Sequence, residues 1–147
     1  MKKLFITFII LILILSIGGC TENKNDSAAD NNSEEQIDWG KYNGRADEFV
    51  HAMANGDFDA AVAMFDATMA QVLPASALQS DVWDLVCVNA GAFIEFYEKE
   101  NQAVDGYYIC FITSRHENTG VKLRVVFSEN TLIAGLFIED YPAIQVE

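Results

Sequence analysis

Hydrophobic and polar positions divide the chain into four stretches with different patterns. The first is almost entirely apolar from Leu4 to Ile17, and the second, residues 21–38, is almost entirely polar. From Trp39 to Gly91 apolar residues recur at the three- or four-residue spacing of amphipathic helices. Beyond Gly91 apolar residues alternate with polar ones, which is the period of strands. This order predicts one α+β domain behind an N-terminal leader.

Three helices are predicted first, and each has a recognisable boundary. The first ends at Asn55-Gly56, Asp57 is a good N-cap for the second, and Asp66 can cap a short third helix that ends before Pro74. Their inward positions follow the helical period. These positions are Ala46, Phe49, Val50 and Met53 in the first helix, and Phe58, Ala61, Val62 and Phe65 in the second.

A fourth helix is predicted after Ser80, with Gly91 as its C-cap. Its expected stripe consists of Val82, Leu85, Val86 and Asn89. Because Trp83, Cys87 and Val88 add apolar side chains on the other sides, we expect this helix to be the most buried of the four.

Four strands are predicted in the last third of the chain, at Phe93–Lys99, Tyr107–His116, Val121–Phe127 and Thr131–Ile138. The short polar turns at residues 118–120 and 128–130 favour antiparallel hairpins. Since all helices precede all strands, we expect the helices to pack on one face of a curved, four-stranded antiparallel sheet.

The N-terminal segment has the features of a secretory leader. Lys2 and Lys3 precede the apolar run, which is shorter than the about 20 residues of a spanning helix and ends at two glycines. Ile17-Gly18-Gly19-Cys20 resembles the lipobox of prokaryotic lipoproteins, which implies cleavage before Cys20 and a diacylglyceryl group on its sulfur. A plain signal peptide and an uncleaved anchor are the alternatives. The expected location is the outer face of a prokaryotic cell membrane, with the lipid as the membrane contact.

Residues 20–38 are rich in Asn, Asp, Glu and Ser, and such a segment forms no core. We expect it to act as a flexible tether. The predicted organisation is therefore a signal peptide at 1–19, a tether at 20–38 and one domain at 39–147. Within this range Cys87 and Cys110 lie among apolar neighbours, so we expect two free thiols rather than a disulfide.

The charge of the chain argues against nucleic acid as a partner. There are 22 acidic and 9 basic residues, for a net charge of -13. Two of the basic residues, Lys2 and Lys3, belong to the leader, so the exported part is more acidic still. Nucleic-acid binding depends on lysine and arginine side chains that neutralise phosphates, and this chain has few.

Motifs that indicate chemistry are missing from the sequence. There is no Gly-rich phosphate loop, no His-Glu-x-x-His, no Cys-x-x-Cys and no Gly-x-Ser-x-Gly. We therefore expect no cofactor, no metal and no catalytic residues. His51 and His116 are interpreted as solvated surface histidines, and Asp66 as a helix cap rather than a general base.

Five residues are candidates for a ligand site: Asp66, Phe93, Glu95, Phe111 and Phe137. Glu95 shares the predicted strand face of Phe93, where it points either into a cavity or, as the more ordinary case, to solvent at the sheet edge. The strands carry apolar residues on both faces, more than a few short helices can cover. We expect the excess to line a pocket or a dimer interface, with an open end near Phe93, Phe111 and Phe137 beneath the helices. Lys122 and Arg124 are expected on the exposed side of the third strand.

The domain resembles the DUF3887 family of proteins of unknown function. The similar positions cover Ala46 to Ile138 and comprise Phe49, Asn55-Gly56-Asp57-Phe58, Phe65-Asp66, Met69, Leu73-Pro74, Leu78, Trp83, Gly91-Ala92-Phe93, Val125-Val126-Phe127 and Ile133-Ala134-Gly135-Leu136. The resemblance implies a cystatin-like or NTF2-like cone, in a domain that occurs alone in lipoproteins or ahead of secreted α/β-hydrolase domains. It carries over no catalytic residues.

Three functions fit the sequence. The first is a surface-tethered, non-catalytic module that binds a small apolar ligand or a protein partner. The second is an isomerase-type or hydrolase-type enzyme with Asp66 or Glu95 as its base, and the third is a dimerisation or scaffolding domain. We favour the binding module, because the sequence offers a surplus of apolar residues but no evident pair of acid and base.

Overall fold

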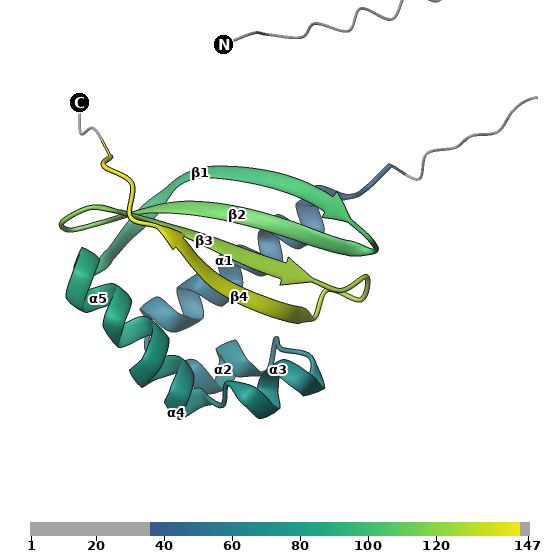
Figure 1. Ribbon diagram of the computed structural model, residues 1–147, viewed down its shortest axis with the longest axis horizontal. Helices are drawn as coiled ribbons and strands as arrows, with labels where there is room; N and C mark the ends of the chain where they lie inside the picture. The colour runs from purple at the N-terminus through teal and green to yellow at the C-terminus, as the bar shows by residue number, and fades with distance from the viewer. Residues whose placement is uncertain (1–35, 145–147) are drawn as a thin grey trace, which may run out of the picture. The chain divides into compact units, whose positions relative to one another are not determined.

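The structure is a computed structural model that describes residues 36–144, all within one compact unit at residues 35–147. Helices come first and a four-stranded antiparallel sheet follows, with the helices gathered on one side of the sheet (Figure 1). The predicted α+β class is confirmed. The leader, Cys20 and residues 21–35 of the tether lie outside the described residues.

The first helix, α1 (Trp39–Ala54), begins where Asp38 caps it, since the carboxylate accepts a hydrogen bond of 3.0 Å from the backbone N–H of Gly40. The predicted apolar stripe is confirmed and begins one turn earlier, with Tyr42. Its buried residues are Tyr42, Ala46, Phe49, Val50 and Met53. The helix ends at Asn55, as the Asn55-Gly56 pair predicts, and Gly56 has the positive φ of +76° that a glycine adopts at low cost.

Two short helices follow, and both of their predicted caps are confirmed. Asp57 accepts a hydrogen bond of 3.0 Å from the N–H of Ala60 at the start of α2 (Phe58–Val62). Asp66 accepts one of 2.7 Å from the N–H of Met69 in α3 (Ala67–Val72). Such caps satisfy N–H groups that have no partner within the helix.

The predicted fourth helix is longer than the sequence indicates and is not the most buried one. It begins with α4 (Ala75–Ala77), continues as a π-helical turn, η1 (Leu78–Trp83), and ends as α5 (Asp84–Ala90). Its buried residues are Leu78, Trp83, Val86 and Ala90. Leu78 and Trp83 are five residues apart, which is the spacing of a π turn rather than of an α-helix. The turn rotates the later residues, so that Leu85 is 51% and Val88 79% exposed. Gly91 is the C-cap as predicted, at a φ of +82°.

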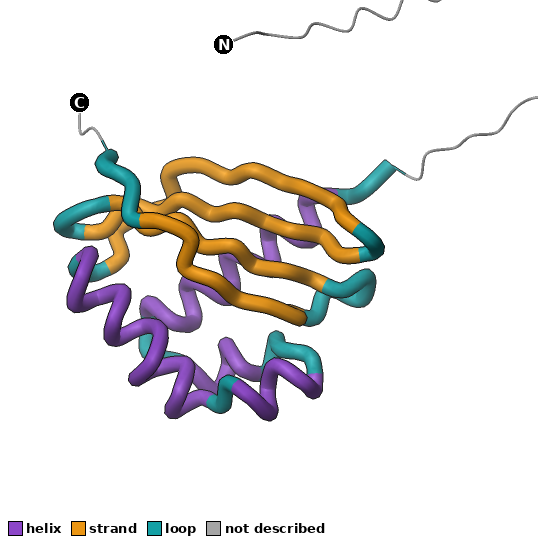
Figure 2. The backbone as a smooth tube through the Cα atoms, viewed as in Figure 1, coloured by secondary structure: helices purple, strands orange, loops and turns teal. Residues whose placement is uncertain are grey.

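The sheet consists of β1 (Phe93–Val104), β2 (Tyr107–His116), β3 (Gly120–Phe127) and β4 (Ile133–Asp140), paired in that order as an antiparallel meander (Figure 2). The predicted strands and hairpins are confirmed. β1 continues five residues beyond its predicted end, because Asp105 and Gly106 form a tight turn with φ values of +50° and +80°. These values suit a two-residue hairpin of the primed type, which matches strand twist.

The core lies between the helices and one face of the sheet, which we call the covered face. Side chains alternate along the strands, and those turned to the helices are nearly inaccessible to solvent. They include Cys110, Ile112, Leu123, Val125, Phe127 and Ile133. These side chains meet the stripe of α1 in a single cluster. The other side, which we call the open face, carries Ile109 and Phe111 of β2, Lys122, Arg124 and Val126 of β3, and Phe137 of β4.

Candidate functional site

The two candidate carboxylates, Asp66 and Glu95, have different roles, and each already accepts a hydrogen bond. Asp66 caps α3, as described above, which confirms the capping interpretation. Glu95 accepts a hydrogen bond of 2.8 Å from the Nε of Arg115, and its side chain is 58% exposed. The interpretation of Glu95 as a solvated residue on an edge strand is therefore confirmed.

The prediction that Phe93 and Glu95 lie on the same face of the first strand is wrong. The pairing of β1 with β2 shifts between Phe93 and Glu95 and again between Phe96 and Glu98, as β-bulges do. Phe93 and Phe96 consequently both pack against the core, with ring centroids 5.2 Å apart, while Glu95 is exposed. Because a bulge inserts an extra residue, Glu95 does not share the face of Phe93.

Phe111 and Phe137 lie on the side of the sheet opposite to Phe93. Phe111 stands between Cys110 and Ile112, which are both fully buried in the core, so the alternation of the strand turns Phe111 away from the helices. The predicted opening of a cone beneath the helices, shared by the three phenylalanines, is therefore wrong. The expected surplus of apolar residues on the second face of the sheet does exist.

On the open face, register partners form two rows across the strands. One row contains Glu100, Phe111, Arg124 and Phe137, and the next contains Gln102, Ile109, Val126 and Gly135. Tyr107 and Phe137 remain 49% and 47% exposed. Since the helices lie on the other side (Figures 1 and 2), the described part of the chain leaves this aromatic and aliphatic surface open to solvent.

Two cations are fixed over the rings of the open face. The Nζ of Lys122 lies 5.4 Å from the ring centre of Phe111 and donates a hydrogen bond of 2.9 Å to Glu100. The guanidinium carbon of Arg124 lies 4.1 Å from the ring centre of Phe137. Its Nε is 2.8 Å from Glu139, although without the alignment of a hydrogen bond. Both cations therefore lie near a carboxylate as well as over a ring, so neither carries an uncompensated charge.

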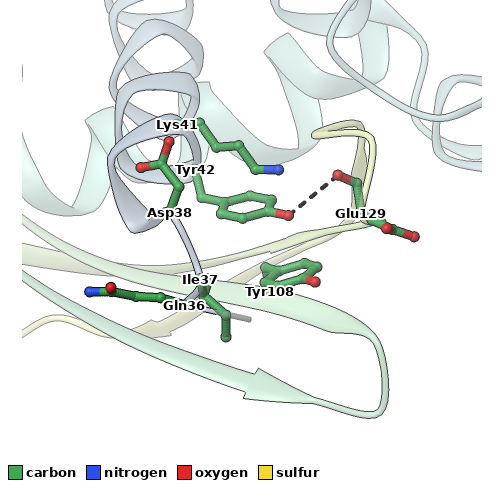
Figure 3. Close-up of a pocket in the computed structure, with 7 residues that line it drawn as sticks. All are labelled: Gln36, Ile37, Asp38, Lys41, Tyr42, Tyr108 and Glu129. Carbon is green, nitrogen blue, oxygen red and sulfur yellow. Dashed lines mark hydrogen bonds between the residues drawn. The ribbon is translucent and has the colours of Figure 1, made fainter. Parts of the chain in front are cut away.

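A cleft of about 230 Å³ lies at the start of α1, next to the first described residues (Figure 3). The rings of Tyr42 and Tyr108 stack with centroids 4.3 Å apart and planes inclined by 13°. The hydroxyl of Tyr42 donates a hydrogen bond of 3.3 Å to the backbone carbonyl of Glu129. Burial raises the pKa of Tyr42. The residues that line the cleft are Gln36, Ile37, Asp38, Lys41, Tyr42, Tyr108 and Glu129.

Lys41 distinguishes this cleft from the rest of the domain. Its Nζ lies 4.7 Å from the ring centre of Tyr42. Within residues 36–144 the other five cations are all in ion pairs, and Lys41 alone has no carboxylate partner. The cleft is small and its lining mixes charged and aromatic groups, so its chemistry suits a polar molecule better than the apolar ligand that the sequence favours.

His116 is buried, and its interpretation as a solvated residue is wrong. Its side chain is only 3% exposed, with Nδ1 2.9 Å from the carbonyl of Gly91 and Nε2 3.2 Å from the hydroxyl of Ser114. Since a carbonyl can only accept, Nδ1 carries a hydrogen and donates it to Gly91. The Ser114 hydroxyl near Nε2 also lies 3.4 Å from the carbonyl of Val121, to which it donates. Burial lowers the pKa of His116, and the Gly91 bond opposes this in part. His116 thereby links the end of β2 to the C-cap of α5.

The predictions for His51 and for the two cysteines of the domain are confirmed. His51 is exposed, and its ring meets Phe96 edge-on at 5.0 Å. Cys87 and Cys110 are both free, as predicted. Cys110 is buried, and burial raises the pKa of its thiol to about 12, so it is not a nucleophile at neutral pH.

No group of three or more His, Cys, Asp or Glu side chains between residues 36 and 144 is arranged to hold a metal ion. None of the helices described here has the length and apolar character needed to cross a bilayer.

The covered and open faces define a small two-layer α+β domain with an exposed aromatic surface. The chain belongs to the family described as protein of unknown function (DUF3887), which matches residues 46–136. This match confirms the resemblance seen in the sequence. No curated protein and no solved structure matches the chain. The cystatin-like or NTF2-like cone and the lipoprotein context that the resemblance implies stay predictions.

Proposed function

We propose that this protein is a membrane-tethered, non-catalytic module that binds a protein partner on the open face of its sheet. The supporting observation is the row formed by Phe111, Arg124 and Phe137, where Phe137 is exposed, Phe111 is partly exposed and the arginine is already paired with a carboxylate. Aromatic residues and arginine are the residue types that contribute most to protein interfaces.

A protein suits this surface better than a small apolar ligand does. Small ligands occupy concave pockets that bury most of their surface, whereas Phe137 is 47% exposed on a sheet face. A protein partner can cover such a face without a cavity, as one sheet covers another in a sandwich.

The state of the two candidate carboxylates supports a role without catalysis. The carboxylate of Asp66 is occupied by the N–H of Met69, and that of Glu95 is paired with Arg115 in solvent. A general base needs a free carboxylate beside the proton that it removes, and an acid partner with an opposed pKa shift. The two residues also belong to different layers of the domain.

The membrane tether rests on the sequence, because Cys20 lies outside the described residues. The supporting features are the leader and the Ile17-Gly18-Gly19-Cys20 step. Metabolic labelling with a fatty-acid analogue should mark the wild-type protein and leave Cys20→Ala unmarked. Equal labelling of the two proteins would show that Cys20 is not the lipid site.

Photocrosslinking in cells tests the binding surface directly. A benzophenone side chain in place of Phe137 should give a discrete protein adduct on illumination. The same group in place of Val88, which is 79% exposed on α5, is the matched control and should give none. Identical adduct patterns at the two positions, or no adduct at Phe137, would exclude the open face as a specific binding surface.

A further inference from the structure

The open face has a self-complementary pattern that indicates which partner covers it. We infer that the partner is a second copy of this chain, packed face to face about a twofold axis that runs parallel to the strands. This inference rests on the proposed function, since it names the occupant of the same surface. Closed twofold pairs are the commonest assemblies of soluble proteins.

The register of β2 and β3 determines which residues of the two copies would meet across such an axis. Rotation about a line between β2 and β3 lays β2 of one copy over β3 of the other and keeps each row opposite itself. Phe111 pairs with Arg124 within one sheet, and Ile109 pairs with Val126. Across the two copies, Phe111 therefore faces the second copy's Arg124, and Ile109 faces the second copy's Val126. The four central positions match ring to cation and aliphatic to aliphatic.

The guanidinium of Arg124 is suited to this double contact. It lies over the ring of Phe137 in its own chain, 4.1 Å from the ring centre, and its side chain is 35% exposed. A guanidinium is planar and stacks on aromatic rings through either side. One side of Arg124 contacts Phe137, and in the inferred pair the other side receives the Phe111 ring of the second copy.

The distribution of charge also favours contact through the open face. Residues 36–144 contain 16 acidic and six basic side chains, so two copies repel each other at long range. Three of the six basic residues, Arg115, Lys122 and Arg124, lie on the open face. The helical segment from Phe58 to Ala90 has four aspartates and no basic residue. Each of the three basic residues on the open face is paired with a glutamate, so this face repels a second copy less than the helical segment, where no basic residue offsets the aspartates.

This combination predicts a distinctive response to salt. An apolar interface between two acidic copies strengthens as salt screens their repulsion. A basic partner would respond in the opposite way, because salt weakens attraction between unlike charges. Salt dependence therefore separates a second copy from a basic protein on the same face.

The experiment uses two full-length copies with different affinity tags, expressed together and recovered from membranes in mild detergent. Wild-type copies should copurify, and more strongly at high salt. Arg124→Glu in both copies, or Phe111→Lys in both copies, should reduce copurification about tenfold or more, because each change removes or repels both central contacts. Val88→Asp on α5 should leave copurification unchanged.

The most decisive test combines two copies that carry different substitutions. When one copy carries Arg124→Glu and the other carries Phe111→Lys, one central contact becomes an ion pair and the other keeps its wild-type residues. Copurification should return to near the wild-type level, which also shows that both variants fold. Failure of the mixed pair to recover while both variants accumulate normally would overturn the face-to-face geometry. If wild-type copies do not copurify at any salt concentration, the second copy is not the partner. A Phe137 crosslink to a different protein would then still support the proposed function.

Discussion

Both faces of the sheet carry aromatic side chains, but the two faces differ in how far these side chains are buried. On the covered face Phe127 is fully buried and His116 has a hydrogen-bond partner for each ring nitrogen. On the open face Phe137 is half exposed and lies under a cation. The covered face is closed by the protein's own helices, whereas the binding partner that we propose would cover the open face. Stability should therefore depend on the first face and association on the second.

The largest expected difference between the faces is in core packing. Phe127→Ala on β3 should lower the free energy of unfolding by about 3–5 kcal/mol, because the ring leaves a cavity in a closely packed core. Phe137→Ala on β4 should cost less than about 1 kcal/mol, since its ring is already half solvated. Denaturant unfolding of the two variants measures both values. Equal losses would mean that the open face is part of the core.

Titration of His116 on the covered face should have a smaller effect. It should change the free energy of unfolding by about 1.4 kcal/mol per pH unit at most. In the unfolded chain a histidine titrates near its ordinary pKa of about 6.5, and burial lowers the pKa of His116 in the folded protein. Between these two values the unfolded chain binds a proton that the folded protein does not. The contribution of His116 is therefore complete above pH 6.5 and is lost as the pH falls toward the folded pKa.

Unfolding measured between pH 7.5 and 5.5 checks this expectation. His116→Gln should remove most of the loss of stability on acidification, whatever its stability at neutral pH. His51→Gln is the matched control, because His51 is exposed, and it should keep the wild-type slope. An unchanged slope in His116→Gln would show that His116 is not the group that titrates.

The cap of α3 should contribute about 1 kcal/mol. Asp66→Ala removes the acceptor for the N–H of Met69 and should destabilise the protein by that amount, whereas Asp66→Asn keeps an acceptor and should cost far less.

Glu95→Gln should change stability by less than about 0.5 kcal/mol, because its ion pair with Arg115 is exposed. Neither Asp66→Asn nor Glu95→Gln should abolish any activity found. If one did so in a folded protein, the enzyme hypothesis would replace the binding module.

The sequence predicted those features that depend on local chemistry. The caps at Asp57 and Asp66, the end of α1 at Asn55 and the C-cap at Gly91 are each set by one or two residues. The strands follow from alternation, and their order in the sheet follows from short polar turns. These signals are readable because few distant contacts can override them.

The errors arose where the period of the pattern changes inside an element. The π turn at Leu78–Trp83 rotates α5 relative to a regular helix, and this rotation exposes Leu85. The bulges in β1 separate Glu95 from the face of Phe93. Neither irregularity has a clear signature in one sequence. The burial of His116 could have been found, because it alternates in phase with Ile112 and the other buried residues of β2.

The candidate site was misplaced for a different reason. Alternation shows that Phe111 and Ile112 point to opposite sides of the sheet, but it does not show which side the helices occupy. That choice depends on packing between α1 and the strands, which the sequence pattern does not contain. The surplus of apolar residues was therefore predicted correctly, while its location beneath the helices was not.

Accessibility of the open face in cells tests the account most directly. In a Cys87→Ser background, Val126→Cys on the open face and Val88→Cys on α5 are compared by maleimide labelling, first in intact cells and then in dilute purified protein. We predict that Val126→Cys is protected in cells and becomes reactive on dilution, while Val88→Cys reacts in both states. Equal reactivity of the two cysteines in cells would show that nothing covers the open face, and would contradict its role as the binding surface.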